Sequence, residues 1–446
     1  MARLSPARAE ALKRLFASVS DDILKTLDSA LTLGAADCPS TFAAAAHARS
    51  EREERRLRDH VFAPLLPLAR PCREGVDTAA AARLPFNPAP DLWRLLRRTD
   101  ARTITEALTA LRDGDAPELG PDVVDELTAL AAERLATHPE WSLLRERLHA
   151  RSEDATARLS RALELAPVVR RTIGRARALT RAPSDAHAAA LRLAYRDAEA
   201  RTPGAGLVLL AMLAADLERP WQVMRLISAV MDRPSDTFLA STEFGAFALA
   251  VLADVDARLA ALRAFDGATG PEGGAAAGAA VFTCALEVVE LEQSLTLDRD
   301  GPWGRRVRSQ KQELARIVEQ HLKGAVQWLD RVLPVHAKRL GGRVRGAPRL
   351  DDAFDVPAAQ RTLGLLAFLD GVRTSASFGG FATTRSRIIE ELDGRLDQYV
   401  EDLLELLRSE DEHAGVRERL HFAGDCLGMV REPRAAELVR RRAAAA

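Results

Sequence analysis

Three pairs of glutamate and histidine are the residues of this chain whose types and spacing could perform chemistry. The pairs are Glu146 and His149, Glu410 and His413, and Glu418 and His421. Residues three apart share a helix face, and two such pairs on facing helices, with two further glutamates, can hold a carboxylate-bridged di-iron centre. One hypothesis for the chain is therefore a helical metalloenzyme that uses Glu-x-x-His pairs.

The apolar residues around the first and third pairs predict that their glutamates face solvent. At 100° per residue, the apolar side chains of each segment form one stripe, and Glu146 and Glu418 lie on the opposite side. The two stripes are Trp141, Leu144 and Leu148, and Val416, Leu420, Ala423 and Leu427. The second pair falls in a charged run that is typical of a helix end. We therefore predict no metal site, no catalytic residue and no cofactor.

The remaining motifs are weaker still. Asp298-Arg299-Asp300-Gly301 begins like an EF-hand loop but lacks the third ligand and the glutamate at position 12, so we expect a turn. Gly341-Gly342 does not continue into a dinucleotide or phosphate-binding fingerprint and is expected to be a flexible joint. His321 lies on an apolar stripe, where a hydrogen-bonded core histidine is more common than a ligand. An enzyme is thus the less expected class.

Charge is nearly balanced over the chain, with a net charge of −1, which excludes a globally basic nucleic-acid-binding protein. Between residues 301 and 350, however, twelve lysines and arginines stand against three acids. The stretch between Asp330 and Asp351 contains no acid, and we expect it to form an exposed basic loop. Its candidate anion-binding residues are Lys338, Arg339, Arg343 and Arg345.

A second basic surface is predicted on a helix over residues 170–181, where arginines occupy one broad face. They are Arg170, Arg171, Arg177 and Arg181, with Arg175 beside them. Together, the two surfaces suggest binding to an anionic surface such as nucleic acid or acidic lipid. We favour the alternative that the acid-rich segment 390–405 neutralises the basic segment within the fold.

Composition predicts an all-α fold for this chain of 446 residues. Hydrophobic residues make up 47% and charged residues 28%, which is enough to bury a substantial core, and the abundant Ala, Leu, Arg and Glu favour helices. The four cysteines form no Cys-x-x-Cys pair, as is typical of a reducing compartment. Because neither a secretory signal nor an apolar run of ~20 residues is recognised, we predict a cytoplasmic protein without a transmembrane segment.

Six prolines in the central part of the chain predict the starts of successive helices, since proline is tolerated in the first turn and disfavoured in the interior. They are Pro121, Pro139, Pro167, Pro183, Pro203 and Pro220. Helices joined by short turns lie antiparallel, which predicts helical hairpins stacked as a solenoid-like array or a bundle. No residue pattern aligns between the units, so no repeat family is assigned.

The predicted organisation has three helical parts separated by two linkers. Residues 1–84 form an N-terminal helical segment, followed by a proline-rich linker over 85–90. A central stacked-helix domain covers 91–266. A glycine-rich linker over 267–278 leads to a C-terminal helical domain over 279–446.

The C-terminal domain is predicted to contain two long amphipathic helices, because apolar residues recur there at intervals of three and four. The first stripe is Leu314, Val318, His321, Ala325, Trp328 and Val332, and the second is Ile389, Leu392, Leu396, Tyr399, Leu403 and Leu406. The second stripe is shorter than three heptads, so an intramolecular helix pair is expected and homodimerisation through the stripe is the alternative.

These observations predict a cytoplasmic α-helical scaffold or adaptor that acts through protein–protein interaction with a partner that the sequence does not identify. The alternative is a binder of an anionic surface, such as nucleic acid or acidic lipid, through the basic C-terminal loop. The helical metalloenzyme is the remote alternative.

Overall fold

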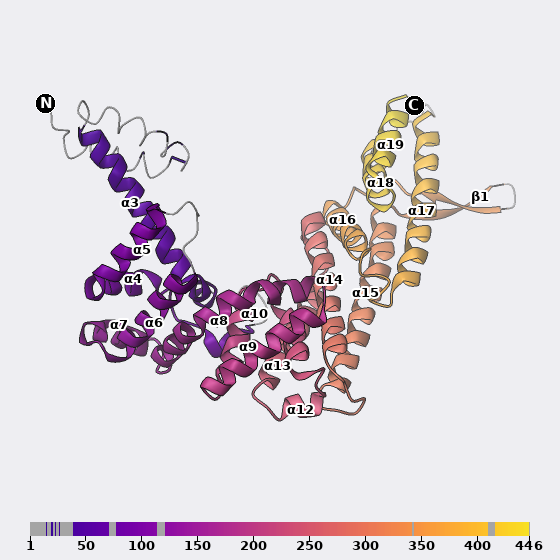
Figure 1. Cartoon of the computed structure of the whole chain (residues 1–446). Coiled ribbons are helices and arrows are strands. Elements are labelled where there is room, and N and C mark those ends of the chain that lie inside the picture. Colours follow the sequence, from indigo (N-terminus) through magenta and orange to yellow (C-terminus); the bar gives the residue numbers. More distant parts are fainter. Residues whose placement is uncertain are drawn as a thin grey trace. The chain divides into compact units, whose positions relative to one another are not determined.

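The computed structural model describes residues 39–70, 77–113, 121–340, 343–408 and 415–445, together with five single residues near the N-terminus. The prediction of an all-α fold is confirmed, since helices dominate and a single two-stranded sheet is present in these ranges (Figure 1). The solenoid-like stacking of the helices stays a prediction.

The chain divides into two compact units at Met231 and Asp232. Unit 1 lies before this boundary and unit 2 follows it. The boundary falls inside the predicted central domain, 91–266, and the predicted domain limits themselves stay a prediction.

Unit 1 is a set of packed helices around α10, which is apolar on every side and buried. Its longest helix, α8, packs against α6, α9 and α10. The elements in chain order are α3 (Pro39–Val61), η1 (Ala63–Ala69), η2 (Ala80–Ala82), α4 (Ala89–Thr99), α5 (Ala101–Asp113), α6 (Pro121–Thr137), η3 (Pro139–Trp141), α7 (Ser142–His149), α8 (Ala155–Arg181), α9 (Asp185–Arg201), α10 (Ala205–Ala215), η4 (Pro220–Gln222) and α11 (Val223–Met231).

Five of the six prolines mark helix starts as predicted. Pro121 opens α6, while Pro139 and Pro220 open the short 3-10 turns that lead into α7 and α11. Pro183 and Pro203 stand two residues before α9 and α10.

The sixth prediction is wrong, because Pro167 lies inside α8. A proline there leaves the carbonyl of Leu163 without its helical donor, at a cost of about 3 kcal/mol. The neighbouring side chains Ala166, Val168 and Val169 are buried against other helices. Packing along the full length of α8 therefore outweighs the local cost, which the sequence pattern alone does not reveal.

Unit 2 contains the remaining helices and the sheet. Its most extensive helix contact is between α14 and α16, and α17 packs against α15, α18 and α19. The elements are α12 (Asp236–Ala240), α13 (Gly245–Ala264), α14 (Gly270–Ser294), α15 (Gly304–Val332), β1 (Val335–Leu340), β2 (Arg343–Pro348), α16 (Val356–Gly371), α17 (Ala382–Arg408), α18 (Val416–Val430) and α19 (Pro433–Ala445). The two predicted amphipathic helices correspond to α15 and α17.

The glycine-rich segment 267–278 lies mostly within α14, where we had predicted a linker. A Cβ atom on Gly274 would lie 2.0 Å from the carbonyl oxygen of Gly364, and one on Gly278 would lie 2.7 Å from the Cα atom of Gly371. These glycines therefore let the backbones of α14 and α16 approach closely. Tertiary packing explains the glycine content that sequence reasoning attributed to flexibility.

Helix α14 is the one helix in the described ranges that is long and apolar enough to cross a membrane by length and composition. Half of its apolar window is buried inside the protein, as in a core helix, so it is weak evidence for a membrane span. This agrees with the prediction of no transmembrane segment.

The predicted basic loop is instead an antiparallel β-hairpin of β1 and β2. Lys338 pairs in register with Arg345, and Leu340 pairs with Arg343. The connecting Gly341-Gly342, predicted as a flexible joint, lies outside the described residues. A Gly-Gly pair between two short runs is itself typical of a β-hairpin, although strand-forming residues are scarce in this chain.

Candidate functional site

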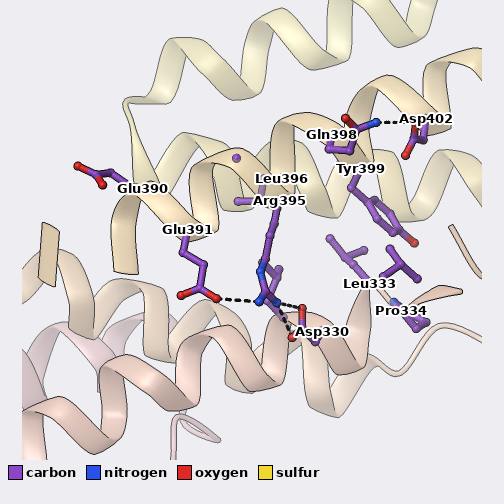
Figure 2. Close-up of a pocket in the computed structure, with 13 residues that line it drawn as sticks. Asp330, Leu333, Pro334, Glu390, Glu391, Arg395, Leu396, Gln398, Tyr399 and Asp402 are labelled. Carbon is purple, nitrogen blue, oxygen red and sulfur yellow. Dashed lines mark hydrogen bonds and ion pairs between the residues drawn. The ribbon is translucent and has the colours of Figure 1, made fainter. Parts of the chain in front are cut away.

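A groove of about 800 Å³ lies in unit 2 between the end of α15, the start of β1 and one side of α17 (Figure 2). Buried apolar side chains form part of its lining, namely Leu329, Leu333, Leu396 and the ring of Tyr399. Around them lie polar side chains, namely Asp330, Glu390, Glu391, Arg395, Gln398 and Asp402. The groove thus combines an apolar surface with four carboxylates and one guanidinium.

Tyr399 lines this groove, and its hydroxyl group is buried without a hydrogen-bond partner in the described parts of the chain. The ring projects from α17 towards Leu333 and Pro334 (Figure 2), and the side chain as a whole is only 4% exposed. Burial raises the pKa of Tyr399 to about 12, against the opposing effect of Arg419. The hydroxyl is therefore protonated and able to donate at neutral pH.

Ion pairs fix one side of the groove. The guanidinium of Arg395 donates to both carboxylate oxygens of Asp330, and its Nη2 lies 2.7 Å from Oε1 of Glu391. These partners raise the pKa of Arg395. Further along α17, the Gln398 amide donates to Asp402 at 2.8 Å. Because the pair of Arg395 with Asp330 joins α17 to α15, these two walls of the groove are held together before any ligand enters.

The predicted self-association stripe on α17 faces mainly into unit 2. Its four central members are buried, and its two end members are half-buried. The members in that order are Leu392, Leu396, Tyr399 and Leu403, then Ile389 and Leu406. The stripe packs inside the protein, and self-association through it stays a prediction.

The acids of α17 pair differently from our expectation. Asp393 and Asp397 bind Arg431, and Glu401 binds Arg442 at 2.6 Å. Four basic residues of α15 form ion pairs with other acids. These pairs are Arg306 with Asp256, Lys311 with Glu292, Arg316 with Glu313 and Lys323 with Glu319. The expected neutralisation of α15 by segment 390–405 is therefore wrong for these pairs. Arg431 and Arg442 can pair with these acids because α18 and α19 pack beside α17.

The predicted arginine face of α8 is engaged within unit 1. Asp125 of α6 binds Arg170 at 2.7 Å and Arg171 at 2.6 Å. Arg177 binds Asp216, and Arg181 lies 3.3 Å from Glu218. Burial lowers the pKa of Arg170 despite its partner. These acids are about 40 residues away in sequence, so local pattern reading could not find them, and anion binding by this face stays a prediction.

The four candidate residues of the basic segment lie on the two strands of the hairpin. In the ladder, Lys338 pairs with Arg345, Arg339 pairs with Val344, and Arg343 pairs with Leu340.

Two of the three Glu-x-x-His pairs lie in the described ranges, one in each unit. Glu146, His149, Glu418 and His421 are exposed, and the pair Glu410 and His413 lies outside the described residues. No group of three or more metal-ligating side chains is arranged for a metal in the part of the chain that the structure describes.

His321 is a core histidine, as predicted. Its Nε2 lies 2.8 Å from the carbonyl oxygen of Leu262, and Phe265 and Phe368 contact its ring edge to face. Burial lowers the pKa of His321, which favours the neutral ring at neutral pH.

Sequence reasoning missed a buried charged cluster between α13 and α14. Glu287 is fully buried, with its Oε1 3.4 Å from Nε of Arg258, which also binds Asp254. Burial raises the pKa of the nearby Cys284 thiol to about 12. The spacing of residues in the sequence could have indicated this burial. Glu287 lies three residues after Cys284 and four before Leu291, and therefore on the same apolar stripe of the helix. No cavity that we describe opens onto this cluster.

Comparison of the chain with protein-family models, with curated proteins and with solved structures finds no match.

Proposed function

We propose that the protein is a cytoplasmic α-helical scaffold or adaptor that acts through protein–protein interaction, and that the groove between α15 and α17 is its docking surface. The segment it binds is basic and carries an apolar side chain. The groove supplies an apolar surface for that side chain and an excess of carboxylates for its charge. The buried free cysteines Cys284 and Cys426 are compatible with a reducing compartment.

The observation that carries this proposal is the lining of the groove, which places buried apolar side chains beside four carboxylates and one guanidinium. Apolar and aromatic side chains at the centre of a docking surface contribute most of the binding energy, and the charges around them select the partner. Tyr399 contributes its ring to this apolar surface. Its hydroxyl is buried without a partner among the described residues, so the ring and not the hydroxyl is available to a bound segment.

The test is a titration with two fluorescein-labelled model peptides of equal length, one built from Lys and Leu and one from Glu and Leu, followed by fluorescence anisotropy. The Lys-Leu peptide is expected to bind and the Glu-Leu peptide is not. Glu390→Lys should weaken binding of the Lys-Leu peptide, whereas Glu418→Lys on the exposed face of α18 is the matched control and should not.

Tyr399→Phe is the second control, because it removes the buried hydroxyl and keeps the ring that lines the groove. Removing an unpaired buried hydroxyl should leave the melting temperature unchanged or raise it, and binding of the Lys-Leu peptide should not change. Equal binding of both peptides, or binding that ignores Glu390→Lys, would contradict the proposed function.

The second candidate function is binding of an anionic surface by the hairpin, and the composition of its two strands favours it. The sequence between residues 335 and 348 holds four basic residues and no acid, and a two-stranded ribbon fits the major groove of DNA. Affinity for heparin or acidic liposomes should fall steeply between ~50 and ~200 mM salt. Replacing Lys338, Arg339, Arg343 and Arg345 with glutamine should abolish retention without changing the melting temperature, and no retention of the wild type would rule this function out.

A further inference from the structure

We propose that the segment docked in the groove is the β-hairpin of a second copy of this chain, so that the protein forms a twofold-symmetric dimer. The inference rests on the proposed function of the groove and names the partner. It starts from the charges that lie on either side of Val335, the residue that lines the groove and begins β1.

On one side of Val335 is the groove, lined by four carboxylates and one guanidinium. On the other side are the two strands, whose sequence between residues 335 and 348 holds four basic residues and no acid. The strand β2 packs against α17, so an acidic half and a basic half lie next to each other within unit 2.

A surface with adjacent acidic and basic halves is complementary to itself after a rotation of 180°. In a twofold pair, the acidic half of each copy faces the basic half of the other, and both contacts form at once. A partner of one charge would satisfy only one half. The arrangement therefore favours a second copy over a separate basic protein or an anionic polymer.

The hairpin also has features that a second copy would cover. It extends away from the helices of unit 2 beyond α17 (Figure 1), and Val335 at its base is 60% exposed. A two-stranded ribbon is marginally stable by itself and has open edges that favour pairing or cover. Docking against the groove of another copy would bury this apolar base and place the basic strands beside the carboxylates.

Charge reversal on the full chain tests the dimer. The groove variant is Glu390→Lys with Gln398→Lys, which leaves the ion pairs of Arg395 in place. The hairpin variant is Lys338→Glu with Arg345→Glu. Sedimentation equilibrium and light scattering at about 50 mM salt, where charge is weakly screened, should give the wild type twice the 48.5 kDa mass of one chain.

Each variant alone should show a dissociation constant for the dimer raised about tenfold or more, because the substitutions cancel the net charge of one half and the attraction is lost at both contacts. An equimolar mixture of the two variants should form a heterodimer, since the lysine-bearing groove meets the glutamate-bearing hairpin and the unchanged halves still match. Recovery in the mixture shows that neither variant is simply misfolded. Glu418→Lys, the surface control, should stay dimeric.

A monomeric wild type would overturn the inference, as would variants that stay dimeric or a mixture that does not associate. The peptide titration separates this failure from failure of the proposed function. A monomer that still binds the Lys-Leu peptide, with binding weakened by Glu390→Lys, keeps the groove as a docking surface for another protein. A monomer that binds no peptide loses both proposals, and a monomer retained on heparin through the hairpin identifies the anionic-surface function.

Discussion

Replacing Glu287 with glutamine is expected to stabilise the protein at neutral pH and to remove one source of its pH dependence. The carboxyl group is fully buried beside Asp254 and Arg258 of α13. Burial raises the pKa of Glu287 to about 9, the Asp254 carboxylate adds to this rise, and Arg258 opposes it. The group is therefore protonated in the folded protein at pH 7.

The magnitude follows from proton linkage. A glutamate ordinarily has a pKa of 4.5, so between pH 4.5 and about 9 the folded protein holds one proton more than the unfolded chain. The contribution of Glu287 to stability is fully present below pH 4.5 and falls by about 1.4 kcal/mol per pH unit as the pH rises towards 9. At pH 7 the free energy of unfolding is therefore about 3 kcal/mol lower than it is below pH 4.5. Glutamine has no such proton to lose, and its amide can donate to Asp254.

Urea unfolding followed by circular dichroism at several pH values between 5 and 8 measures this effect. The free energy of unfolding of the variant, relative to that of the wild type, should increase by about 1.4 kcal/mol for each unit by which the pH rises. Glu418→Gln on the protein surface should show no such trend. An infrared band of a protonated carboxyl group at pH 7 should disappear in the variant. A pH-independent difference, or a variant that is less stable throughout, would refute the assignment of a buried protonated Glu287.

Four further substitutions test the packing of unit 2. Leu396→Glu should unfold the unit, with loss of helical circular dichroism, because an unpaired carboxylate at a fully buried position costs several kcal/mol; a folded variant would show that the stripe is an exposed seam. Gly274→Ala should lower the melting temperature, because the new Cβ would meet a carbonyl oxygen of α16, whereas Gly394→Ala, with nothing within 4 Å, should raise stability by up to about 1 kcal/mol. Asp236→Ala should cost about 2 kcal/mol in a denaturant titration, because its buried carboxylate accepts backbone N–H groups of Asp298 and Trp303; an unchanged midpoint would contradict that role.

Part of the candidate site could be read from the sequence. The apolar periodicity of residues 389–406 predicted the helix and the inward side of Leu396 and Tyr399. The groove itself could not be predicted, since it exists only where the end of α15 and the start of β1 meet α17. The sequence also could not predict that the Tyr399 hydroxyl lacks a hydrogen-bond partner, because this depends on which polar groups of neighbouring elements lie within reach of it.

The sequence by itself determined the local structure of this protein. Composition and apolar periodicity predicted the all-α class, and Pro183 predicted where α9 begins. The N-cap serines of α9 and α12, Ser184 and Ser235, accept from backbone N–H groups at 3.3 Å and 3.2 Å. These features depend on residues within a few positions of one another, so a linear pattern is enough to encode them.

Only the tertiary structure decided which faces meet. It kept Pro167 inside α8, turned the glycines of 267–278 into a close helix contact, and paired the acids of α17 with Arg431 and Arg442. Periodicity shows that a helix has an apolar side or a charged side but does not specify the partner, because the energy of burial and of ion pairing depends on contacts between distant segments. The pairing of α15, β1 and α17, and with it the groove, is therefore a property of the folded chain.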